Sequence, residues 1–101
     1  MPEMLVTRRV NPTGTSKVNV IQLPADREGV AKFVGIYNAG TADVVLIIYE
    51  GDDIVDEILV AAGERKEMTG DSIYKFNEGK TISVALNTSG DVRVTMTIQI
   101  R

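Results

Sequence analysis

Four acids close together in the sequence, Asp52, Asp53, Asp56 and Glu57, are the residues whose type and spacing best suit a chemical role. Hard cations such as Ca²⁺ take about six to eight oxygen ligands, and carboxylates supply many of them. A Gly-Asp-Asp turn with two further acids could provide some ligands, although the spacing of the EF-hand loop is absent. The alternative is a solvated hairpin whose charges prevent an exposed strand from pairing with other chains. We favour this second interpretation and predict no metal ion or other cofactor.

Histidine and cysteine are both absent from the 101 residues. Their absence removes the commonest general base, the commonest transition-metal ligand, thiolate nucleophiles and disulfides. Glycoside hydrolysis by two carboxylates would need a cleft at a set separation, and a sandwich of this size has little room for one. The sequence also contains no P-loop and no GxGxxG motif. We therefore predict that the protein is not an enzyme.

The net charge of −3 is unevenly distributed along the chain. Residues 43–71 carry nine acids and two bases, a net −7, whereas residues 1–32 and 72–101 each sum to +2. Nucleic-acid binding requires clustered lysine and arginine, which this chain lacks. No apolar stretch is long enough to span a bilayer. The charge pattern predicts protein partners rather than nucleic acid or membrane, and it would allow one copy to meet another head to tail.

The six apolar and aromatic residues of Val44–Tyr49 form the stretch around which the other elements must be arranged. The stretch is β-branched, short and bounded by glycine and acids, so it predicts a strand. One alternating set is Val44, Leu46 and Ile48, and the other is Val45, Ile47 and Tyr49. Both faces are apolar, so something must cover the second face. We take Val45, Ile47 and Tyr49 as the candidate oligomer interface.

Short alternating segments separated by glycine turns make up most of the chain. Glycines at 40, 51, 63, 70, 79 and 90 fall seven to twelve residues apart. The expected strands are 18–23, 30–38, 44–49, 54–60, 65–68, 72–76, 81–87 and 91–100. Only the loop 25–29 could hold a short helical turn. The pattern predicts an all-β fold, a single antiparallel sandwich of about eight strands with Greek-key or jelly-roll-like order.

The first 17 residues are expected to form an extended N-terminal arm in front of a β-sandwich domain at 18–101. Prolines, a glycine and hydroxyl residues break any regular period there. The candidate partner-binding residues of this arm are Met4, Leu5, Val6, Arg8 and Arg9. Such an arm is either a disordered terminus or an extended strand that becomes ordered by adding to the sheet of a neighbouring subunit.

Four motifs carry a resemblance to a known class of proteins. They are Ile36-Tyr37-Asn38-Ala39-Gly40-Thr41-Ala42-Asp43-Val44, Ile48-Tyr49-Glu50-Gly51-Asp52, Val60-Ala61-Ala62-Gly63-Glu64 and Val92-Arg93-Val94-Thr95-Met96. Together they resemble small β-sandwich virion proteins of tailed bacteriophages, such as capsid decoration proteins and tail accessory proteins. The shared motifs are chiefly turn chemistry, so no functional residue is carried over from them.

The resemblance implies a non-enzymatic structural protein, often trimeric, that binds a repeating protein lattice. On this basis we expect a capsid decoration or stabilisation protein that forms a homo-oligomer, a trimer first of all. It would be located in the virion after assembly in the host cytoplasm. The alternative is a ligand-binding β-sandwich module, for carbohydrate or calcium, in a larger complex such as a phage tail.

Overall fold

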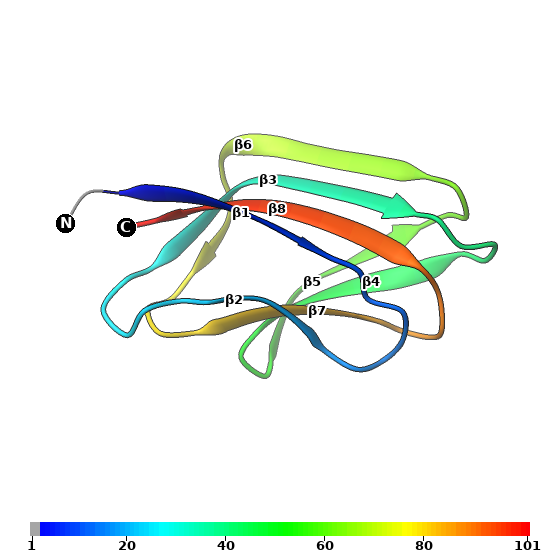
Figure 1. Cartoon of the computed structure of the whole chain (residues 1–101), viewed down its shortest axis with the longest axis horizontal. Coiled ribbons are helices and arrows are strands. Elements are labelled where there is room, and N and C mark those ends of the chain that lie inside the picture. Colours follow the sequence, from blue (N-terminus) through cyan, green and yellow to red (C-terminus); the bar gives the residue numbers. More distant parts are fainter. Residues whose placement is uncertain (1–2) are drawn as a thin grey trace.

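The computed structural model describes residues 3–101 and folds them into eight β-strands without a helix (Figure 1). The strands are β1 (Met4–Val10), β2 (Val18–Gln22), β3 (Gly29–Asn38), β4 (Val44–Glu50), β5 (Asp53–Val60), β6 (Arg65–Phe76), β7 (Thr81–Leu86) and β8 (Val92–Ile100). The loop 25–29, where the sequence allowed a helical turn, contains only a tight turn. The all-β prediction is confirmed.

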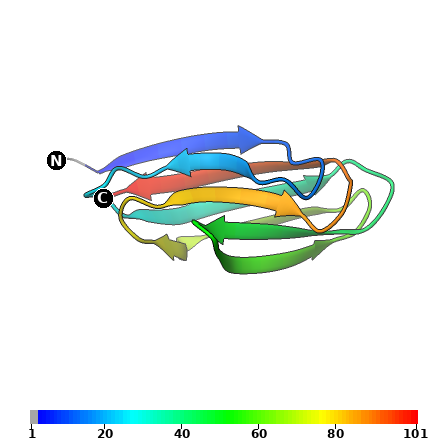
Figure 2. The same ribbon diagram turned by 90° about the horizontal axis from the view of Figure 1, so that it is seen from below.

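Two four-stranded antiparallel sheets face each other, one in the order β1-β8-β3-β6 and the other in the order β2-β7-β4-β5. Figure 2 shows the second sheet with its four strands side by side. The chain crosses between the sheets at every connection except the β4–β5 hairpin. This double Greek-key order is that of a jelly roll, one of the two orders that the sequence left open.

The core lies between the sheets and is built from the alternating residues of the strands. In β8 the buried side chains are those of Val92, Val94, Met96, Ile98 and Ile100, as the period-2 pattern predicted. In β4 the buried set is Val44, Leu46 and Ile48. Because side chains alternate along a strand, the other apolar set of β4 must lie on the outer face of its sheet.

Asn38 holds the turn that leads from β3 into β4. Its side chain is fully buried, and its amide donates to the carbonyl oxygens of Ala42 (2.9 Å) and Val60 (3.0 Å). Its side-chain oxygen accepts from the backbone N–H of Gly40 (2.9 Å). These bonds tie the ends of β3, β4 and β5 together, so the direction of β4 depends on this residue.

The expected N-terminal arm differs in the structure, because residues 4–10 form an edge strand of the domain's own sheet. β1 pairs with β8 in register from Met4↔Ile100 to Val10↔Val94. Val6 and Val10 pack against the core. Residues 11–17 connect β1 to β2, and the backbone oxygens of Thr13 and Gly14 accept bonds from Gly90 and Leu86. Pro12 and Gly14, which disturbed the pattern, belong to this connection and not to the strand, and Pro2 lies outside the described residues.

The two strands expected at 65–68 and 72–76 are one long strand, β6. Both halves pair with β3, and the register shifts between Ala31 and Phe33 of β3. Gly70 and Asp71, which suggested a turn, lie in this irregular part of the strand. A bulge accommodates the extra residues without reversing the chain.

Candidate functional site

The outer face of the β2-β7-β4-β5 sheet carries the candidate interface residues. Val45, Ile47 and Tyr49 all point away from the core and are half-buried by their neighbours on the sheet. The structure therefore brings these three residues together in a row along one central strand.

Strand β5 extends this apolar surface beyond the residues that the sequence analysis named. Leu59 pairs with Val45, Glu57 with Ile47, and Ile54 with Tyr49. The side chains of Leu59 and Ile54 are 61% and 54% exposed. We call Val45, Ile47, Tyr49, Ile54, Glu57 and Leu59 the β4–β5 face. The sequence analysis missed Ile54 because a bulge opposite Ile48 and Tyr49 changes which β5 residues point outward.

The four acids that opened the sequence analysis do not converge on one point. The Asp52 carboxylate lies 3.2 Å from the Lys17 ammonium, which also stands 4.3 Å from the centre of the Tyr49 ring. Asp56 accepts a hydrogen bond from the Tyr74 hydroxyl on β6. In residues 3–101, no group of three or more acidic, histidine or cysteine side chains is placed to hold a metal ion.

Tyr74 is the titratable group whose environment is most changed by folding. Burial raises the pKa of its hydroxyl well above the ordinary value, and the hydrogen bond to the Asp56 carboxylate and that carboxylate's charge raise the pKa further. The pair links β5 to β6 at the edge where the two sheets meet. The hydrogen bond helps to hold this edge together.

The candidate arm residues are distributed over both faces of β1. Met4 and Leu5 are 51% and 66% exposed, whereas Val6 packs on the core. Arg8 is exposed at the sheet edge, and Arg9 lies on the outer face opposite Thr95 of β8. These five residues do not form one surface.

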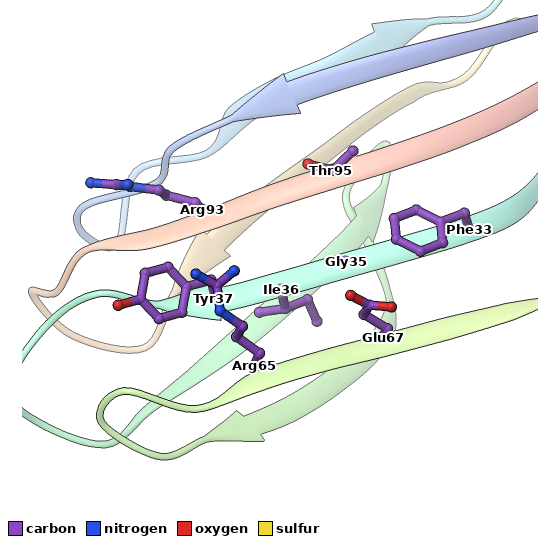
Figure 3. A pocket seen from close by; sticks show the side chains of 8 residues that line it. All are labelled: Phe33, Gly35, Ile36, Tyr37, Arg65, Glu67, Arg93 and Thr95. Atoms are coloured by element: carbon purple, nitrogen blue, oxygen red, sulfur yellow. The ribbon is translucent and has the colours of Figure 1, made fainter.

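A shallow groove of about 250 Å³ lies on the outer face of the β1-β8-β3-β6 sheet, over strand β3 (Figure 3). Gly35 forms its floor, between Phe33 and Tyr37 on the same face of β3. A Cβ atom at position 35 would stand 2.9 Å from the Phe33 ring, so the glycine makes room for this ring beside the groove. We call this feature the β3 groove.

The walls of the β3 groove come from the strands on either side of β3. Tyr37 pairs with Arg65 on β6 and with Arg93 on β8, so the three side chains form one row across the sheet. Gly35 pairs in the same way with Glu67 and Thr95, and Thr95 pairs with Arg9 on β1.

Electrostatically the groove is basic. The Arg65 guanidinium stacks 4.0 Å from the centre of the Tyr37 ring. Within the described residues, neither Arg9 nor Arg93 forms an ion pair or a side-chain hydrogen bond. Two arginines, Arg65 and Arg93, line the groove with one acid, Glu67, on a chain whose net charge is −3. The groove was not predicted from the sequence, since nothing in the sequence places β6 and β8 beside Gly35.

In the described part of the chain, no helix is long and apolar enough to cross a membrane.

Comparison with known proteins gives likenesses of structure only. No family model and no curated protein sequence matches the chain. A chain in the acid-stable capsid of Helicobacter pylori bacteriophage KHP30 matches with a TM-score of 0.63 at 10% identity, over 99% of this chain and 94% of that one. A chain of the cyanophage Pam1 capsid matches with a TM-score of 0.52 at 15% identity, over 96% of this chain and 84% of that one.

A third likeness comes from outside viruses. A chain of the Bacillus endospore appendages, a family of disulfide-linked pili, matches with a TM-score of 0.56 at 16% identity, over 96% of this chain and 86% of that one. At these identities the likenesses show the fold alone: the jelly roll of this chain also occurs in chains of two phage capsids and of a pilus.

Proposed function

We propose that the chain is a non-enzymatic structural protein of a virion, whose copies associate with one another and with a protein lattice. The observation that carries this proposal is the β4–β5 face, an apolar surface on the outside of the jelly roll. The capsid-like fold supports the assignment to a virion, because the phage neighbours are capsid chains.

The size of the β4–β5 face favours a closed oligomer or a lattice over an isolated pair. Covering about 300 Å² of apolar surface contributes about 7 kcal/mol at about 25 cal/mol per Å². Association costs about 4–15 kcal/mol, so one such contact alone is weak. In a ring each copy makes two contacts, and in a lattice it makes more. We therefore propose a homo-oligomer, with a trimer as the smallest ring.

Within the virion we propose a role in decorating or stabilising the capsid. The resemblance of the turn motifs to capsid decoration and tail accessory proteins supports this role. The absence of a long basic stretch in the sequence and its net charge of −3 favour protein partners over nucleic acid. On this proposal the protein is assembled in the host cytoplasm and remains in the virion.

The second candidate, a carbohydrate- or calcium-binding module, has one feature in its favour, the β3 groove. Small-molecule pockets usually enclose about 300–1,000 Å³ and bury most of the ligand. The groove, at about 250 Å³, is smaller than this and open on one side. The volume and openness of the β3 groove therefore suit one or two protein side chains better than a sugar ring.

Size-exclusion chromatography with light scattering, with and without calcium, separates the two candidates. We expect a stable oligomer of defined mass that is unaffected by calcium or by a chelator. A monomer that changes its mass or its thermal stability only with calcium would replace the structural proposal with the ligand-binding one.

A further inference from the structure

The β3 groove and the β4–β5 face have complementary properties on opposite sheets of the same molecule. The groove has two aromatic side chains, Phe33 and Tyr37, and two arginines, Arg65 and Arg93, to one acid, Glu67. The β4–β5 face has two protruding apolar side chains, Ile54 and Leu59, around one carboxylate, that of Glu57.

Charge points to an acidic occupant for the groove. Arg65 and Arg93 line it together with one acid, Glu67. Within residues 3–101 Arg93 forms no ion pair, and Arg65 is engaged with the Tyr37 ring. Arg93 can therefore receive an incoming carboxylate, which arginine binds in a two-pronged geometry.

The volume of the groove limits the occupant to one or two side chains. A water molecule occupies about 30 Å³ of liquid, so about 250 Å³ corresponds to roughly eight waters. Because the groove is open, a strand can lie over it in the direction of β3 and insert alternate side chains, as in the recognition of extended segments.

We propose that the β3 groove receives the outward side chains of β5 from a second copy of this chain, with Glu57 bound by Arg93 and Leu59 inserted between Phe33 and Tyr37. The proposal rests on the self-association proposed above and names the two surfaces that meet.

The spacing along the strands fits this arrangement. Glu57 and Leu59 are two residues apart on one face of β5, a distance of about 7 Å along a strand. In the groove, the row with Arg93 and Tyr37 and the row with Gly35 are also two residues apart. A carboxylate over the first row therefore places the leucine over the second, between Phe33 and Tyr37.

The contact is heterologous, because each copy offers its groove to one neighbour and its β5 strand to another. Heterologous contacts close into a ring when the rotation between copies allows it, and otherwise form open stacks. The acidic character of residues 43–71, which contain β5, adds a long-range attraction to the basic groove.

The test is a charge exchange followed by sedimentation velocity over a concentration series. Arg93→Glu and Glu57→Arg should each weaken self-association about tenfold or more, because each places like charges in the contact. The double variant Arg93→Glu/Glu57→Arg should restore association, since the groove of every copy then meets a complementary β5 strand, whatever the number of copies in the ring. Arg8→Glu and Glu78→Arg, which make the same charge changes at exposed positions outside both surfaces, should behave as the wild type.

The possible outcomes separate this proposal from the proposed function. If the wild type associates and neither exchange weakens it, the groove contact is wrong and the structural role stands. If both single variants lose association and the double variant does not regain it, Arg93 and Glu57 do not meet and the proposal is overturned. A wild type that stays monomeric at hundreds of micromolar overturns both the contact and the proposed self-association. Circular dichroism of each variant checks that the sandwich is intact.

Discussion

Tyr74 and Asp56 join the two sheets at one edge of the sandwich, and their environment makes the folded state sensitive to alkaline pH. The hydroxyl of Tyr74 is partly buried and donates to the Asp56 carboxylate, so ionising it would bury a second negative charge beside the first. The folded state therefore keeps a proton that the unfolded chain releases above about pH 10.

We predict that the free energy of unfolding falls as the pH rises above about 10, and that Tyr74→Phe reduces this fall. The raised pKa contributes stability that is fully present below the unfolded value and is lost as the pH rises toward the folded value. At neutral pH the variant should lose about 1–2 kcal/mol with the hydrogen bond. Urea unfolding at neutral and alkaline pH measures both effects, with Tyr37→Phe as the matched control. An equal alkaline loss of stability in wild type and Tyr74→Phe would contradict the assignment.

The residue types of β4 predicted part of the candidate site. The β3 groove depends on pairing between strands that lie far apart in the sequence. Both alternating sets of β4 are equally apolar, so the sequence did not decide which set faces outward. The β3 groove was not predicted, because Arg65 and Arg93 reach it only through the pairing of β6 and β8 with β3. Asn38 was recognised as a turn residue, but its bond to Val60 on another strand was not.

Strands with regular alternation were predicted well, and the errors lie where a strand departs from it. β8 alternates over its full length and was placed within a residue of its bounds. β1 was taken for an arm because prolines, a glycine and hydroxyl residues break any regular period over residues 1–17. Within β1, Arg8 stands opposite the buried Met96, and an edge strand tolerates a long charged side chain there because its end can reach water. β6 was divided in two because a bulge and a turn share the same glycine-acid signature.

The placement of β1 predicts that removing residues 1–10 destabilises the domain. Val6 and Val10 would lose their contacts with the core, and the edge of β8 would be exposed. We expect the free energy of unfolding to fall by about 2–4 kcal/mol and the melting temperature by about 10 °C or more. Removal of residues 1–3 alone leaves β1 intact and is the matched control. A free arm would instead give the same melting temperature for all three proteins in differential scanning calorimetry.

For the whole molecule, the sequence predicted a sandwich but left its strand order open. Each sheet joins strands from distant parts of the chain, as in the pairing of β1 with β8. Local patterns carry no information on such pairings, whereas they do carry the length and spacing of strands. The jelly-roll order matters for function because it puts the β4–β5 face and the β3 groove on opposite sides of one rigid body.

Sedimentation velocity of the wild type and of Ile47→Asp tests the central claim, that this jelly roll assembles through an apolar outer face. Ile47 points away from the core at the centre of the β4–β5 face, so a charge there should leave the fold intact. Burying that charge in a contact between copies would cost free energy, because the carboxylate would lose its water without gaining a partner. Ser89→Asp, at an exposed loop position, is the control for the added charge. We predict a discrete oligomer for the wild type and the control, and a folded monomer for Ile47→Asp. A wild type that sediments as a monomer at every concentration, or a folded Ile47→Asp that assembles as the wild type does, would contradict the account.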